Sequence, residues 1–117
     1  MRHHDHNRKF GREKAGREAL LRLLAENLIE RMRIRTTEAK AKELRPIVEK
    51  LVTKAKIPGL AANRYLQSRL KTTKVVTKLT KEIAPKYSQR MGGYTRIVKL
   101  PPRKSDGSRM ALIEFVE

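Results

Sequence analysis

The side chains of this sequence that could most readily hold a metal ion lie near its start. His3, His4 and His6 surround Asp5, and together they offer imidazole nitrogens and a carboxylate, which are common ligands of transition metals. The segment around them has almost no apolar residues, so nothing there would fix the rings or supply the hydrogen bonds that orient metal ligands. We therefore expect no functional metal site.

Beyond that segment the sequence lacks the groups of most catalytic sites. It contains no cysteine, which excludes disulfides, thiol nucleophiles and cysteine-bound zinc. The histidines all lie in the first segment, so no imidazole base is left for the folded part of the chain. No glycine-rich phosphate loop and no zinc-protease motif is present. We expect neither an enzyme nor a cofactor, with no catalytic residues and no small-molecule substrate.

Electric charge is the strongest signal in the composition. Lys and Arg number 29 against 12 Asp and Glu, which gives a formal net charge of +17. A compact domain with that charge repels itself unless a polyanion neutralises it, and nucleic acid is the most common such partner. No apolar run approaches the roughly 20 residues of a membrane span, and no signal peptide follows Met1. We expect a soluble, cytoplasmic nucleic-acid-binding protein with no membrane partner.

The basic residues indicate how the protein would bind nucleic acid. Aromatic residues are few and tryptophan is absent, which argues against a platform that stacks single-stranded bases. Neutralisation of phosphates and recognition of the shape of folded RNA remain. The cations of the first 17 residues, followed by those around the expected C-terminal hairpin, are Arg2, Arg8, Lys9, Arg12, Lys14, Arg17, Lys86, Arg90, Arg96, Lys99, Arg103, Lys104 and Arg109.

Two glycines precede Tyr94 and have two interpretations. Without side chains, Gly92 and Gly93 would let the backbone approach a nucleotide closely. They would equally well form a flexible joint that leads into the following strand. The sequence favours neither interpretation.

Apolar residues at three- and four-residue spacing predict four helices. The first spans about residues 14–32. The second starts at Thr36-Thr37-Glu38, where a hydroxyl cap precedes an acid, and continues to about Lys56 with a kink at Pro46. Shorter helices follow Pro58-Gly59 and Thr72-Thr73, and Pro85 ends or bends the last. The residues expected in the core are Leu44, Val48, Leu51, Leu79, Ile97 and Ile113.

The last third of the sequence predicts strands. Residues 95–100 and 110–116 are rich in β-branched and other apolar residues, and a basic turn-rich loop separates them, as in an antiparallel hairpin. A lone hairpin is marginally stable, and residues 33–36 are the natural third strand. The expected fold class is α/β (α+β), with about four helices on a small mixed sheet that ends in a C-terminal β-hairpin. We expect a basic N-terminal arm at 1–13 and a single domain at 14–117.

Several blocks of the sequence resemble the family of bacterial large-subunit ribosomal protein seventeen. They are the opening Met1–His3, the block from Arg33 to Arg45, the block from Gly92 to Leu100, and the closing Met110–Glu117. Together they span nearly the whole chain in the family's order and spacing.

The resemblance implies a role as a structural constituent of the ribosome. It implies an extended arm, assembly on large-subunit ribosomal RNA at the solvent side near the peptide exit tunnel, and large-subunit protein thirty-two as a neighbour. The ribosome would be that of a bacterium or of an organelle of bacterial descent. The RNA-binding residues that we expect are Arg2, Arg8, Lys9, Arg12, Arg17, Thr36, Thr37, Lys40, Lys42, Arg90, Tyr94 and Arg96.

Three other functions fit the charge. A DNA-binding protein of nucleoid or regulatory type would present a recognition helix, and residues 63–69 are the nearest candidate. A protein-interaction domain would dock acidic partners without preferring RNA. A factor that associates only transiently with the ribosome would be released by high salt, whereas a structural constituent would be retained.

Overall fold

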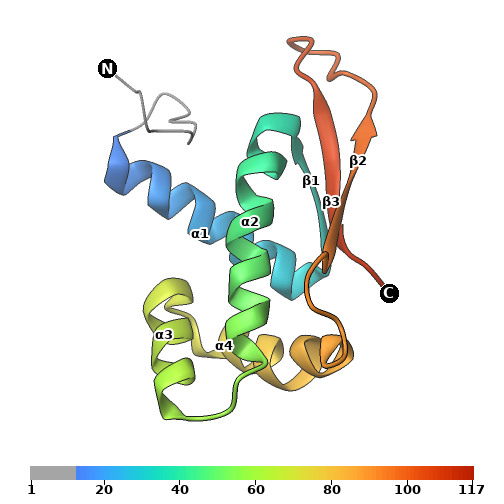
Figure 1. Ribbon diagram of the computed structural model, residues 1–117. Helices are drawn as coiled ribbons and strands as arrows, with labels where there is room; N and C mark the ends of the chain where they lie inside the picture. Colours follow the sequence, from blue (N-terminus) through green and yellow to red (C-terminus); the bar gives the residue numbers. More distant parts are fainter. Residues whose placement is uncertain (1–12) are drawn as a thin grey trace, which may run out of the picture.

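The structure is a computed structural model that describes residues 13–117 (Figure 1). A long helix, α1 (Lys14–Arg31), leads into strand β1 (Arg33–Thr37) and then into α2 (Glu38–Ala55). Helices α3 (Leu60–Leu70) and α4 (Thr73–Lys78) follow, and the chain closes with strands β2 (Thr95–Leu100) and β3 (Met110–Phe115). The predicted α/β fold with four helices and a C-terminal hairpin is confirmed.

The three strands form one sheet in the order β1-β3-β2. Arg33 pairs with Glu114 on one side of β3, and Arg96 pairs with the same residue on the other. Both pairings are antiparallel, which corrects our expectation of a mixed sheet. Because β3 lies between β1 and β2, these two strands run in the same direction without being neighbours, so no parallel pair arises. The predicted third strand at Arg33 is confirmed.

Alternation along the strands gives the sheet two unlike faces. Ile34, Ile113 and Ile97 lie side by side across the strands on the inner face, and Ile113 is fully buried. The next row, formed by Arg35, Leu112 and Val98, lies on the outer face. In Figure 1 helix α2 runs along one side of the sheet, and none of the other labelled elements lies on its opposite side. Among the described residues, the outer face is therefore left to basic and partly exposed apolar side chains.

Helix α2 is the centre of the core. Thr37 caps it, because its side-chain oxygen accepts a hydrogen bond from the backbone N–H of Lys40 at 3.3 Å. Its apolar stripe faces inward, and the predicted core residues Leu44, Val48 and Leu51 are part of it. None of the side chains of the stripe is more than 3 % exposed, and they are Ala41, Leu44, Val48 and Leu51. The helix continues through Pro46, whose exposed position lets it interrupt the backbone bonding without opening the core.

The predicted fourth helix changes its winding along its length. After α4 the chain forms a π-helical turn, η1 (Leu79–Ile83), and then a 3-10 turn, η2 (Ala84–Tyr87). The Thr80 hydroxyl donates to the Val76 carbonyl at 3.0 Å, and Pro85 has no N–H to continue the α-helical ladder. Leu79 and Ile83 nevertheless stay buried as predicted. The Thr80 hydroxyl bond and the missing N–H of Pro85 therefore accompany the change in helical winding, while the apolar side chains of the segment remain in the core.

Basic side chains of α4 tie this segment to α1. Lys78 donates through Nζ to the Glu30 backbone carbonyl at 2.5 Å, and the Lys74 ammonium lies 3.7 Å from the Glu30 carboxylate. Lys74 and Lys78, one helical turn apart on α4, thus make contacts within the protein.

We predict that Leu51→Ala lowers the free energy of unfolding by about 2–5 kcal/mol, because Leu51 lies in the core and its truncation leaves a cavity. Urea denaturation followed by circular dichroism measures the loss. Lys81→Ala, at an exposed position, is the control and should change the free energy by less than about 0.5 kcal/mol. Equal stability of the two variants would contradict the assignment of this helix face to the core.

Candidate nucleic-acid interface

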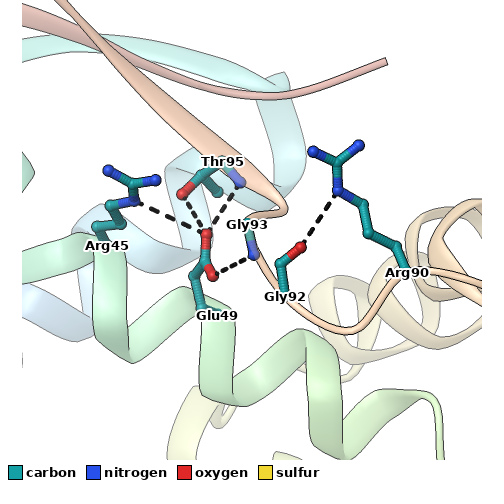
Figure 2. A network of polar contacts seen from close by, with 6 residues as sticks. All are labelled: Arg45, Glu49, Arg90, Gly92, Gly93 and Thr95. Atoms are coloured by element: carbon teal, nitrogen blue, oxygen red, sulfur yellow. Dashed lines mark hydrogen bonds and ion pairs between the residues drawn. The ribbon is translucent and has the colours of Figure 1, made fainter.

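A carboxylate of α2 holds the loop that enters β2. The Gly93 backbone N–H donates to Glu49 Oε1 at 3.0 Å, and the Thr95 backbone N–H and hydroxyl both donate to Oε2, at 3.0 and 2.9 Å (Figure 2). Hydrogen bonds to a charged acceptor are the stronger kind. Glu49 therefore fixes residues 93–95 against the helix, and this loop-fixing role was missed from the sequence.

The glycines make this arrangement possible. Gly93 has φ of +63°, a left-handed conformation that strains other residues, and Gly92 has φ of +151°. With these backbone angles the loop directs the Gly93 N–H at the carboxylate. The glycine pair forms a joint that leads into β2, which is one of the two interpretations of the sequence. The joint is not free, because Glu49 holds it by hydrogen bonds.

Tyr94 lies in the core, which contradicts its expected role as an exposed RNA contact. Only 1 % of it is exposed, and its ring packs 5.2 Å from that of Tyr87. Its hydroxyl donates to the Arg90 carbonyl at 3.2 Å and accepts from Lys56 Nζ at 3.1 Å. The hydrogen bond with Thr53 and then that with Lys56 lower the pKa of Tyr94. The loop faces the protein here because the ring completes an aromatic cluster under the sheet.

Two arginines flank the fixed loop. Figure 2 shows the Arg45 and Arg90 guanidinium groups on either side of it. Arg90, which we predicted, uses its Nε–H for the Gly92 carbonyl at 3.2 Å, so its terminal nitrogens remain to donate elsewhere. Arg45 was missed; its Nε lies 3.8 Å from the Glu49 carboxylate and its side chain is 46 % exposed. Guanidinium groups with free N–H groups can donate forked hydrogen bonds to an anion.

Arg96 is held on the outer face of the sheet. Its Nε–H donates to Glu114 Oε2 at 2.6 Å, yet the side chain remains 59 % exposed. Arg33 of β1 pairs with Glu114 from the other side of β3, so Arg33, Glu114 and Arg96 form one row across the sheet. Arg35 lies two residues after Arg33 and therefore on the same face. The three arginines border an apolar strip that includes Val98, which is 42 % exposed. This face combines three arginines, of which Arg96 is fixed by Glu114, with an apolar surface.

The N-terminus of α2, where the expected RNA-binding residues Thr36 and Thr37 lie, does not form an open phosphate site. Thr36 is buried, and the Thr37 side chain already caps the Lys40 N–H. The Glu38 backbone N–H donates to the Arg109 carbonyl at 2.9 Å, and the Glu38 carboxylate pairs with Lys42 at 2.8 Å. A carboxylate in the first turn repels a phosphate. Lys40 and Lys42 therefore remain candidates as surface cations alone.

The loop between β2 and β3 holds itself in shape. Arg103 pairs with Asp106 through two hydrogen bonds, of 3.1 and 2.9 Å, and the Ser108 backbone N–H donates to the same carboxylate at 3.0 Å. These bonds hold the pKa of Asp106 well below its usual range, chiefly through Arg103. The sequence indicated a basic turn but not that Arg103 would be engaged within it. Lys104 stays exposed at its tip.

The remaining predicted residues divide by their place in the chain. Arg17 lies partly exposed in the first half of α1. Arg2, Arg8, Lys9 and Arg12, together with the histidine cluster, lie outside the described residues. Across residues 13–117 no group of three or more metal-ligating side chains comes together. No helix in this described part is long and apolar enough to cross a membrane.

Known proteins with similar sequences share one family. The family model described as ribosomal protein L17 matches residues 20–116. A protein of Persephonella marina named large ribosomal subunit protein bL17 is 56 % identical over 119 residues, which cover 100 % of this chain and 96 % of the relative. Proteins of the same name from Nautilia profundicola and Desulfitobacterium hafniense are 52 % and 50 % identical, covering 99 % and 93 % of this chain and 98 % and 97 % of theirs.

We predict that Glu49→Gln destabilises the loop, because an amide nitrogen cannot accept the hydrogen bonds that the carboxylate oxygens accept. The free energy of unfolding should fall by about 1–3 kcal/mol, and amide hydrogen exchange at Gly93 and Thr95 should accelerate. Glu82→Gln, an exposed change of the same chemistry, is the control. Unchanged protection of both amides in Glu49→Gln would show that the carboxylate does not hold the loop.

The ion pair at the start of α2 predicts a pH effect. The hydrogen bond from Lys42 lowers the pKa of Glu38 below its ordinary value of 4.5. Because the folded pKa is depressed, the stabilisation is present above the ordinary value and is lost as pH falls through the folded value. NMR titration of the Glu38 carboxyl in Lys42→Met should therefore give a higher pKa than in the unmodified protein. An identical titration in both proteins would contradict this pairing.

Proposed function

The chain belongs to the ribosomal protein L17 family, and we propose that it is a structural constituent of the large ribosomal subunit that binds and stabilises folded ribosomal RNA. The observation that carries the proposal is that exposed arginines stand on surfaces held in shape by carboxylates. Arg45 and Arg90 flank the loop fixed by Glu49, and Arg96 is fixed by Glu114. Guanidinium groups that are already positioned lose little freedom when they bind phosphate.

The binding mode that we propose relies on phosphate contacts and RNA shape. Arginine forks match the geometry of phosphate oxygens, and such contacts place a protein on a nucleic acid without reading its sequence. The proposed contacts among the described residues are Arg17, Lys40, Lys42, Arg45, Arg90 and Arg96. Of the aromatic residues Tyr87, Tyr94 and Phe115, none is more than 7 % exposed, which supports a mode without base stacking by these rings.

We further propose that the segment 1–13 is a basic arm whose Arg2, Arg8, Lys9 and Arg12 also contact ribosomal RNA. A segment with this composition gains little from burial but much from neutralising phosphates. Residues 14–117 would act as the single domain that carries the arm.

The outer face of the sheet supports a second kind of contact. Its apolar strip, bordered by Arg33, Arg35 and Arg96, has the composition of a protein interface, with apolar groups at the centre and arginine at the rim. We include neighbouring large-subunit proteins among the partners, and protein thirty-two remains the proposed one. In a bacterium the site of action would be the cytoplasmic ribosome. The proposal assigns the protein no reaction of its own.

We predict that Arg90→Ala and Arg96→Ala weaken binding to large-subunit ribosomal RNA while leaving the melting temperature within about 2 °C of the unmodified protein, because both side chains lie on the surface. Each change should also reduce the slope of log affinity against log salt by about 1. Filter binding at several salt concentrations measures both effects.

Lys81→Ala serves as the control for the loss of one positive charge. It should retain the affinity of the unmodified protein to within about twofold, because only a general charge effect remains. If the arginine variants bound RNA as this control does, neither arginine would be part of the interface. If the unmodified protein bound duplex DNA in preference to ribosomal RNA, the proposed function itself would fail.

A further inference from the structure

A groove is lined by side chains of α1, α2 and α3. In Figure 1 helices α1 and α3 lie on the side of α2 away from the sheet. One part of the groove, about 370 Å³, is bordered by Arg22 of α1, Lys50 of α2 and Arg69 of α3. A second hollow, about 450 Å³, lies between α2, α3 and the loop at Met91. Lys50 and Tyr65 border both hollows, so they form one path, here called the helical groove. It leads from the fixed loop to the end of α3.

The helical groove has a surplus of positive charge. Lys50, Lys54, Arg69 and Lys71 border it from two helices and the turn after α3. Within residues 13–117 no carboxylate lies within ion-pair distance of these four side chains. Two acids, Glu18 and Glu49, also border the groove, and Glu49 already accepts the hydrogen bonds of the loop. The cations of the groove thus outnumber its acids.

Tyr65 positions two of these cations. The Lys54 ammonium lies over its ring at 5.0 Å from the centroid, and the Arg69 guanidinium carbon lies over it at 5.3 Å. Cation–π attraction holds both side chains beside one ring and limits their freedom before any ligand arrives. The attraction of helix ends for cations favours Lys54 and Arg69, which lie in last turns. This attraction does not account for Lys50, which borders the same groove but lies in the interior of α2, away from its last turn.

We propose that the helical groove binds the sugar-phosphate backbone of ribosomal RNA, at a site apart from the contacts proposed for Arg90 and Arg96. This inference rests on the proposed function and adds a site to it. The cations follow one another along a path that begins at the loop flanked by Arg90, so a single strand could continue from one site to the other. Apolar side chains of Leu21 and Ile47 in the groove would pack against ribose. The ligand is a phosphodiester chain, recognised by charge and shape.

A photo-crosslinking residue placed at Ser68 tests the location directly. Ser68 is exposed and borders the groove, and its replacement disturbs only a hydroxyl bond to the Tyr65 carbonyl. In purified large subunits that contain the labelled protein, irradiation should attach position 68 to ribosomal RNA. The same label at position 81 marks an exposed site outside the groove. Attachment of position 68 to a protein, or to nothing, would overturn the proposal.

A matched pair of double variants tests the groove by affinity. Lys50→Ala with Arg69→Ala should weaken binding of the full chain to ribosomal RNA by about tenfold for each cation and lower the salt slope by about 1 for each. Arg31→Ala with Lys81→Ala removes the same charge from exposed positions outside the groove and should change the affinity by less than about threefold.

This experiment distinguishes failure of the groove as an RNA site from failure of the proposed function. If the groove variant bound RNA as tightly as its control, the groove would carry no RNA while the proposed function stood. If the unmodified protein did not bind ribosomal RNA, the proposed function would fail first. Thermal melting of both variants establishes that they are folded. If the alanine pair melts early, Lys50→Gln with Arg69→Gln, which remove the charge but retain more of each side chain than alanine does, replace it.

Discussion

Repulsion between positive charges constrains every part of this molecule. With 29 basic and 12 acidic residues, the chain can neutralise fewer than half of its cations internally. The carboxylates lie where they fix the shape of basic surfaces. Glu49 holds the loop before β2, Glu114 holds Arg96, Asp106 holds the hairpin loop, and Glu30 joins α4 to α1. Each of these surfaces keeps exposed basic side chains. A polyanion that supplies the missing negative charge would meet cations already in position, which lowers the entropic cost of binding.

The apolar core supports this arrangement through α2. One side of that helix packs beneath the sheet and contributes the buried Leu44 and Val48. Its other side carries the exposed Arg45 and Lys50 and the partly buried carboxylate of Glu49. Burial fixes the rotation of the helix about its axis, and that rotation fixes where the charged groups lie. The same helix therefore presents cations to the fixed loop and to the helical groove.

Periodic patterns predicted most of the fold, because burial imposes a spacing that is visible in the sequence. The stripe of α2, the Thr37 cap and all three strands could be predicted in this way. The antiparallel pairing of β2 with β3 was predicted, because a short loop joins these strands. The position of β1 beside β3 and the antiparallel direction of that pairing were not predicted, because they depend on contacts between residues far apart in the sequence. The interface was harder to predict, since it depends on which side of a loop faces the protein. Tyr94 was predicted as a contact and lies in the core, whereas Arg45 and Glu49, only one helical turn apart, were missed. No local signal distinguishes a glutamate that holds a loop from one that faces solvent.

We propose that this protein is a lasting part of the large ribosomal subunit, held by many phosphate contacts. Sedimentation of a lysate through a sucrose gradient after a high-salt wash tests it most directly. We expect the protein to sediment with the large subunit in a one-to-one ratio to its RNA, because contacts spread over several surfaces act together and are not all lost at once. Release of the protein by the wash, or its absence from the ribosomal fractions, would contradict the claim and favour a transient factor or a DNA-binding protein.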